Sequence, residues 1–161
     1  MRDEFNAESF RLAPMSPLIL TLTILLLALP AVFLVRVPAL ALVLLALYAW
    51  VWVRFRPSRF TVQRTGLQVT WPLKRRDIPR EEIASVRVVD RRELRREIGW
   101  GVRVGAGGLW GGFGCLWTTR RGLVQMYISR RDGYVWIERT AGRPWLVTPE
   151  EPEQFVRALS R

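Results

Sequence analysis

The sequence predicts a membrane-anchored fold: an N-terminal transmembrane hairpin of two helices, then a mainly antiparallel β barrel or sandwich of about seven strands capped by a C-terminal helix. Three observations predict it. Two long uncharged segments stand near the N-terminus, apolar and polar side chains alternate over much of the rest, and the last residues change to a helical period. The expected organisation is a cytoplasmic tail at residues 1–16, the hairpin at 17–53 and a cytoplasmic domain at 54–161.

Each of the two uncharged segments is long enough to cross a bilayer once. The first, at 17–35, has 19 residues and the second, at 37–53, has 17, whereas a span needs about 17–25. One continuous helix through both would be about 55 Å long, far beyond a hydrocarbon core of ~30 Å. We therefore expect a tight turn at Arg36-Val37-Pro38, and we expect Pro30 to kink the first helix or to end it early.

Two other interpretations of this region fit the residues less well. A buried hairpin of a soluble protein would need a polar face, which neither segment has. A cleaved signal peptide would begin with basic residues, whereas residues 1–16, with the acidic pair Asp3-Glu4, carry a net charge of −1.

Basic residues predict the orientation of the hairpin. The turn carries only Arg36, whereas four arginines follow the second segment, at positions 54, 56, 59 and 64. Because basic flanks stay in the cytoplasm, we expect a multi-pass protein of the cytoplasmic (inner) membrane with both termini cytoplasmic. Three aromatic residues near the end of the second segment are expected at the membrane interface: Tyr48, Trp50 and Trp52. Trp50 and Trp52 could instead pack against another helix.

The alternation after residue 54 predicts short antiparallel strands joined by tight turns. Thr65-Gly66 separates two alternating segments, and Asp132-Gly133 is a strong hairpin signal between two more. A further strand is expected at residues 83–88. Near the end, Thr148-Pro149-Glu150-Glu151 matches a capping box, which predicts a closing helix of about 11 residues.

Three stretches of this domain resemble a known family. They are the hairpin at residues 60–67, the Ile-Pro…Glu-Ile step at 78–83 and the sequence Thr-Pro-x-x-Pro-x-x-Phe-Val that ends at residue 156. With the two preceding apolar segments, they resemble the bacterial membrane-anchored proteins that carry a pleckstrin-homology-like (PH-like) domain, over about residues 15–160. The resemblance implies seven strands in two nearly orthogonal sheets capped by a helix, and it implies binding or scaffolding rather than catalysis.

The composition excludes most enzyme classes. The chain has no His, one Cys (Cys115) and one Lys (Lys74), so it lacks the residues for His-based acid–base catalysis, for Cys–His nucleophiles and for zinc sites built from Cys and His. The pairs Glu81-Glu82 and Glu150-Glu151 fit turns and helix ends better than general acid–base chemistry. We therefore expect no enzymatic activity, no catalytic residues, no cofactor and no metal site.

The net charge of +11 lies entirely in residues 54–161. In a soluble protein so basic a domain would suggest nucleic acid, but a tethered domain is expected to meet the anionic membrane leaflet, so no nucleic acid is expected. The residues expected at the lipid surface are Arg54, Arg56, Lys74, Arg75, Arg76, Arg91, Arg92, Arg95 and Arg96. The basic run at 91–97 is compatible with a short charged helix or with an extended loop.

A glycine-rich stretch at residues 99–114, in which eight of 16 residues are Gly, has two interpretations. It is either a tightly curved strand pair with Trp100, Trp110 and Phe113 in the core, or a flexible loop that presents these side chains to lipid headgroups or a partner. The three aromatic residues are our candidates for partner binding, because Trp is frequent among interface hot spots.

The sequence favours a non-enzymatic interaction or scaffold module at the cytoplasmic leaflet, which binds a protein partner and, weakly, anionic lipid. The alternative is an accessory subunit of a larger membrane protein complex, held through its transmembrane hairpin. Association would then depend on close packing within the bilayer, at Thr21, Thr23 and small residues such as Ala39 and Ala41.

Overall fold

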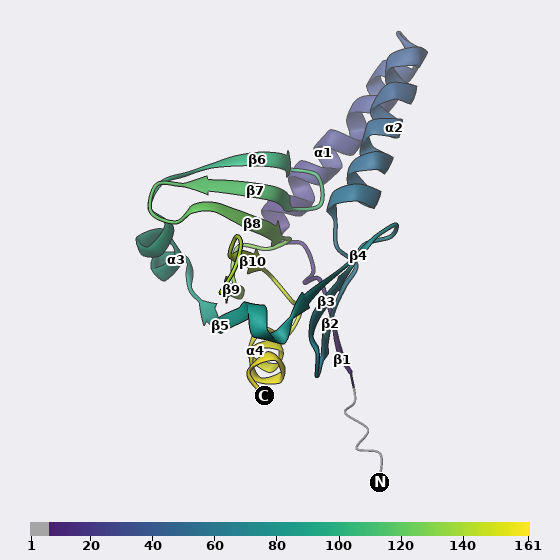
Figure 1. The fold of residues 1–161 in the computed structure, drawn as a ribbon. Coiled ribbons are helices and arrows are strands. Elements are labelled where there is room, and N and C mark those ends of the chain that lie inside the picture. Colours follow the sequence, from purple (N-terminus) through teal and green to yellow (C-terminus); the bar gives the residue numbers. More distant parts are fainter. Residues whose placement is uncertain (1–6) are drawn as a thin grey trace.

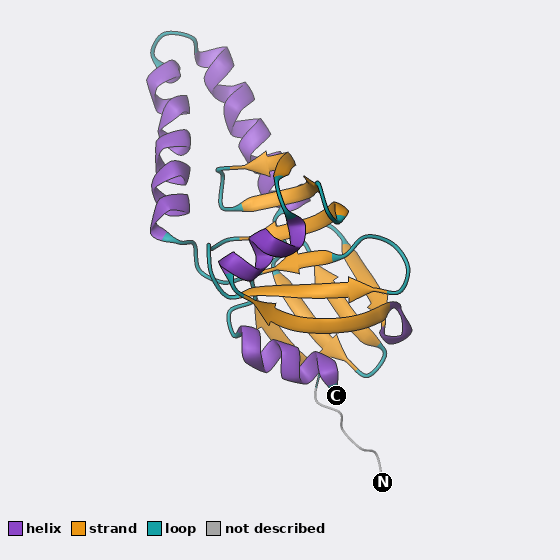
Figure 2. Cartoon of the chain, turned by 90° about the vertical axis from the view of Figure 1, so that its left-hand side faces the viewer, coloured by secondary structure: helices purple, strands orange, loops and turns teal. Residues whose placement is uncertain are grey.

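The computed structural model describes residues 7–161 and shows a pair of helices projecting from a β domain (Figure 1). The helical pair leaves one end of the domain, and the C-terminal helix lies at the opposite end (Figure 2). Asp3 and Glu4, which contribute to the expected charge of the tail, lie outside the described residues.

The projecting helices are α1 (Pro17–Leu34) and α2 (Pro38–Phe55), which pack against each other as an antiparallel pair. Both begin at a proline, whose fixed φ and missing N–H suit the first turn of a helix. Pro30 lies inside α1, which continues to Leu34, so the early end that we considered does not occur. Both helices are long and apolar enough to cross a membrane, and most of their large apolar side chains are exposed.

The β domain consists of two sheets that do not close into a barrel. The first has the order β1-β2-β3-β4 and is antiparallel throughout: β1 (Glu8–Arg11), β2 (Arg59–Gln63), β3 (Gly66–Thr70) and β4 (Arg75–Pro79). The second has the order β5-β9-β10-β8-β7-β6: β5 (Ile83–Val89), β6 (Gly101–Gly107), β7 (Gly112–Thr118), β8 (Gly122–Ile128), β9 (Tyr134–Arg139) and β10 (Trp145–Val147). Within it β8 and β10 run parallel and the other neighbours antiparallel. The described residues thus form more strands than the seven or so expected.

Strand β1 lies in the segment that we expected to be a tail. It pairs with β2 only after the chain has passed through both helices, and Phe10 lies opposite Phe60. The residues between β1 and α1 are also attached to the domain, because the Ala13 N–H donates to the Thr148 carbonyl at 3.0 Å and the Ser16 N–H to the Ser129 carbonyl at 3.1 Å. The helical hairpin is therefore an insertion between two neighbouring strands, held at both of its ends.

Short helical segments complete the domain: η1 (Arg80–Glu82), α3 (Arg91–Ile98) and α4 (Pro152–Ser160). The basic run that was compatible with a helix or a loop forms α3. Asp90 caps its N-terminus, because the Asp90 carboxylate accepts the backbone N–H groups of Arg92 and Glu93 at 2.6 and 2.7 Å. The capping-box prediction is wrong. Helix α4 begins at Pro152, and the Thr148 hydroxyl instead accepts the buried Ser129 N–H at 2.9 Å.

Two apolar cores stabilise the domain. The larger one fills the space between the two sheets and α4, and it includes Phe60, Trp145 and Phe155. The smaller one lies on the other face of the six-stranded sheet, where Leu94 and Ile98 of α3 cover it. The centre of this sheet is therefore covered on both faces, whereas its edge strand β6 is mostly exposed.

Candidate functional site

The β6–β7 turn, residues 108–111, joins the β domain to the helical hairpin. The Thr23 hydroxyl of α1 accepts the Trp110 N–H at 2.9 Å and lies 3.1 Å from the Gly108 carbonyl oxygen, and Thr23 is almost fully buried. The Trp110 ring packs edge-on against Trp52 of α2, with ring centroids 4.8 Å apart. One turn of the domain thus contacts both helices and fixes their direction relative to the sheets.

The three aromatic residues expected at a membrane interface have different surroundings. The Tyr48 hydroxyl donates to the Leu26 carbonyl of α1 at 2.9 Å, so Tyr48 packs between the helices. Trp52 packs on Trp110 of the domain, and Trp50 packs edge-on against Phe55 while remaining half exposed.

Four basic side chains lie on the end of α2 and on the β3–β4 turn and β4, and we call Arg54, Arg56, Lys74 and Arg76 the base cluster. The charge of Lys74 interacts with those of Arg54 and Arg76. Each of three sits over an indole ring: Arg56 over Trp52 at 4.3 Å, Lys74 over Trp71 at 4.4 Å and Arg76 over Trp145 at 5.3 Å. The Trp71 indole donates to the Phe55 carbonyl at 3.2 Å, which ties the β3–β4 turn to the end of α2.

The base cluster carries positive charge that no carboxylate within residues 7–161 pairs with. None of the ion pairs formed between described residues includes any of its four members. Burial lowers the pKa of the Lys74 ammonium, and the charges of Arg54 and Arg76 lower it further. A group of like charges held together in this way is suited to binding an anion.

The remaining basic residues of the expected lipid surface lie elsewhere. Arg75 is opposite Thr70, one position from the core-facing pair Val69 and Arg76, so it points to the other face of the sheet. Arg91, Arg92, Arg95 and Arg96 lie on α3, at the other end of β6 and β7 from the turn that contacts α1 (Figure 1). The seven residues of β6 separate α3 from the β6–β7 turn by about 23 Å.

The glycine-rich stretch forms the β6–β7 hairpin, and its three aromatic residues do not share one environment. Phe113 is in the core, as the first interpretation expected, whereas Trp100 is 71% exposed. Trp110 is half-buried in the turn, with a positive φ of 57°. Neither interpretation is right for all three, and Trp100 and Trp110 lie at opposite ends of β6.

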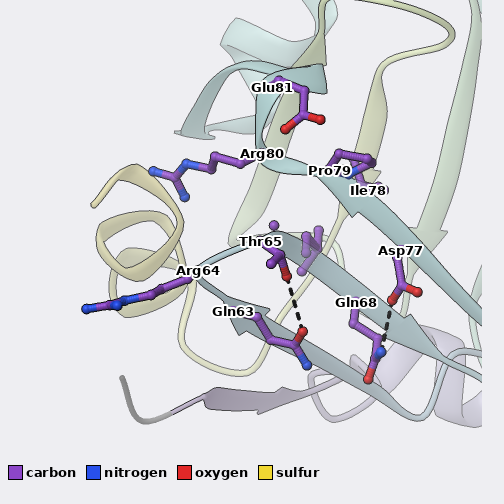
Figure 3. A pocket seen from close by; sticks show the side chains of 11 residues that line it. Gln63, Arg64, Thr65, Gln68, Asp77, Ile78, Pro79, Arg80 and Glu81 are labelled. Carbon is purple, nitrogen blue, oxygen red and sulfur yellow. Dashed lines mark hydrogen bonds between the residues drawn. The ribbon is translucent and has the colours of Figure 1, made fainter. Parts of the chain in front are cut away.

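Two cavities of the domain were not apparent in the sequence. One of about 460 Å³ lies at the β2–β3 turn (Figure 3), where Gln68 donates to Asp77 at 2.9 Å. Arg64 and Arg80 point to one side of it, and Asp77 and Glu81 also line it (Figure 3). The other, of about 300 Å³, lies between α3 and β6 and is lined by apolar and basic side chains.

No group of three or more His, Cys, Asp or Glu side chains arranged to hold a metal ion occurs within residues 7–161. Cys115 lies on β7, half-buried beside Gln125, with its Sγ 3.7 Å from the amide oxygen. The Arg143 guanidinium lies 3.5 Å from the same sulfur.

The family model described as the bacterial PH domain matches residues 58–161, which covers more than half of the chain. No curated protein and no solved structure matches the chain. From β2 to the end of α4, the strands and the closing helix described above constitute this domain, and the chain belongs to the bacterial PH domain family.

Proposed function

We propose that this protein is a non-enzymatic interaction module in which α1 and α2 anchor the PH domain to the cytoplasmic face of the inner membrane. The domain binds a protein partner and, more weakly, anionic lipid. PH domains are typically non-catalytic interaction modules, which supports this class of function. The observation that carries the proposal is the attachment of the domain to two apolar helices, through β1 at one end and through the contact of Thr23 with Trp110.

The pairing of β1 with β2 supports the hairpin topology. Hydrogen-bonded strands must lie on the same side of a membrane, so the chain crosses it an even number of times between residues 11 and 59. Each helix has 18 residues and is about 27 Å long, close to a hydrocarbon core of ~30 Å. The arginines that follow α2, against one at the turn, favour the cytoplasmic side for the domain.

Cysteine labelling tests this orientation. In a Cys115→Ser background, Val35→Cys at the exposed helix turn is expected to react with a membrane-impermeant maleimide in intact cells. Ser160→Cys, at the end of α4, is expected to react only after the cells are permeabilised. Labelling of Ser160→Cys in intact cells would show that the domain lies outside.

The base cluster is expected to dock the domain on anionic headgroups. Leu73, in the β3–β4 turn beside the base cluster, is highly exposed, so an environment-sensitive fluorophore can be attached there through Leu73→Cys. In nanodiscs, we expect its emission to shift to the blue with anionic lipid and to revert in high salt, since exposed charges are screened. Replacing Arg54, Lys74 and Arg76 with Gln should abolish the shift, because each cation near the surface contributes about 1 kcal/mol.

The matched control removes the same number of charges from α3, with Arg91, Arg92 and Arg95 replaced by Gln. This triple variant is expected to keep the emission shift, because α3 lies at the far end of the strands. An equal loss in both triple variants would show a general attraction of the basic domain to the membrane and would exclude a role specific to the base cluster.

The alternative function, an accessory subunit held through its hairpin, rests on the apolar side chains that the helices expose, such as Leu25 and Leu42. An exchange of residues 17–53 for an unrelated two-span hairpin, with Thr23 and Trp52 kept at their places, distinguishes the two functions. We expect a partner that co-purifies with the native chain to remain bound. Loss of the partner while the domain stays folded would favour the subunit.

A further inference from the structure

Strand β6 offers a free sheet edge. It is the last strand of the six-stranded sheet, and β7 is its only hydrogen-bonded neighbour among residues 7–161. Val102, Arg103 and Val104 in its middle are all exposed. An unpaired edge presents backbone N–H and C=O groups that can pair with one more strand.

One face of the sheet beside this edge is apolar. Val102 and Val104 project on the same face, and Trp117 lies opposite Val102 on β7. Leu123 of β8 in turn lies opposite Trp117. All four side chains are at least 38% exposed, which is unusual for large apolar residues that adjoin one another.

The other face beside the same edge is basic at its rim. Here lies the cavity of about 300 Å³, whose apolar floor includes Leu116 and Met126 and whose rim includes Arg91, Arg95 and Arg103. Tyr134 lines the same cavity. Burial raises the pKa of its phenol, and the charges of Arg103, Arg91 and Arg131 partly oppose this rise.

The glycine at position 112 lies beside two residues that line this cavity, Met126 and Arg103. A Cβ there would lie 3.2 Å from the Met126 Cε and 3.5 Å from the Arg103 Nη1. The carboxylates of α3 do not neutralise the rim, because Glu93 pairs with Arg87, and Glu97 pairs with Arg87 and Arg121. The rim is thus available to an acidic group from outside the chain.

We propose that the free edge of β6 accepts an extended segment of the partner protein in which acidic and apolar residues alternate. In a strand, successive side chains point to opposite faces, so one set would meet Val102, Val104 and Trp117 while the other meets Arg103 and the arginines of α3. Backbone pairing supplies affinity, and the two unlike faces supply register and specificity. This inference rests on the proposed function and names the chemistry of its partner.

A second copy of this chain fits the edge less well. Pairing of two β6 strands would bring Arg103 and the α3 arginines of both copies together, where like charges repel. An acidic segment instead meets opposite charge on one face and apolar contact on the other.

The test uses the full chain in detergent micelles and a fluorescent eight-residue peptide of alternating glutamate and valine. We expect saturable binding by anisotropy, and we expect Arg103→Glu to weaken it at least ~10-fold, because reversal turns attraction into repulsion. The matched control is Arg157→Glu on α4, which changes the net charge equally and should bind like the native chain. Equal weakening by both variants would overturn the proposal.

Two N-methylated versions of the peptide test the backbone pairing. Methylation of alternate residues blocks the N–H groups along one edge of the peptide, so one version should lose binding and the other should retain it. Equal binding of both peptide versions would contradict the proposal. So would displacement of the peptide by anionic vesicles, or a dimer of the free chain that Arg103→Glu dissociates. If the peptide fails while a partner survives the hairpin exchange, this inference falls and the proposed function stands.

Discussion

Replacing Phe155 by alanine is expected to lower the free energy of unfolding by about 3–5 kcal/mol. Phe155 is fully buried, and its ring packs edge-on against Phe10 at 5.3 Å and Phe60 at 6.0 Å. These contacts join α4 to the first two strands, so the substitution leaves a cavity where three elements meet. A loss of this size is a large part of the total free energy of unfolding of a domain of this length.

Chemical denaturation of the full chain in micelles, followed by tryptophan fluorescence, measures the loss. The full chain is needed because a fragment that starts at residue 54 would lack β1 and with it Phe10. Arg157→Ala, on the exposed side of the same helix, serves as the control and should change stability by less than about 0.5 kcal/mol. Equal stability of both variants would mean that α4 does not close the core.

Gly105→Ala is expected to disrupt the β6–β7 hairpin and to cost roughly 3 kcal/mol or more. Gly105 has a φ of 144°, which side chains rarely adopt, and a Cβ at this position would lie only 2.3 Å from the Phe113 carbonyl oxygen. Because that oxygen belongs to the neighbouring strand, relief of the contact requires the strands to separate. We therefore expect a lower melting temperature and weaker binding of the alternating peptide.

The same strand provides the control for this substitution. A Cβ on Gly107 would meet nothing within 4 Å, so Gly107→Ala should leave the melting temperature nearly unchanged. If Gly105→Ala proved as stable as Gly107→Ala, the close approach of β6 and β7 at this point would be wrong.

The elements that could be predicted from sequence are those in which one face is buried over several residues. In β2 and β3, Phe60, Val62, Leu67 and Val69 alternate with polar residues, and all four are in the core. The uncharged segments likewise match α1 and α2 within a few residues, because a helix that is apolar on all sides leaves a continuous signal.

The missed strands lack this signal. In β4 the sequence Arg-Arg-Asp-Ile-Pro buries only Ile78, and in β1 the sequence Glu-Ser-Phe-Arg buries only Phe10. Both are held by pairing to β3 and β2 rather than by their own apolar pattern. The capping box misled us because Thr148 is required inside the domain, where it binds Ser129.

The site could be predicted only in part. The basic residues after α2 and on β4 indicated a charged surface. Their spacing did not show that the charge of Lys74 would interact with those of Arg54 and Arg76, or that Arg75 would lie on the other face of the sheet. The contact between Thr23 and Trp110 joins residues 87 positions apart and has no local signature. The free edge of β6 depends on sheet order, which the alternation of side chains does not encode.

The insertion of the hairpin between β1 and β2 has a consequence for biogenesis. The ribosome makes β1 first, then both helices, then β2, so β1 must wait for its partner until both helices have been made. In the topology that we propose, this wait includes delivery of the hairpin to the bilayer. A chain inserted with its two ends on opposite sides can never form this strand pair. In such a chain the edge of β2 stays unpaired and the Phe155 ring lacks its contact with Phe10. Unpaired strand edges and exposed apolar side chains lead to aggregation or proteolysis. In the proposed topology, completion of the four-stranded sheet would therefore report that both ends of the hairpin lie on the same side of the membrane.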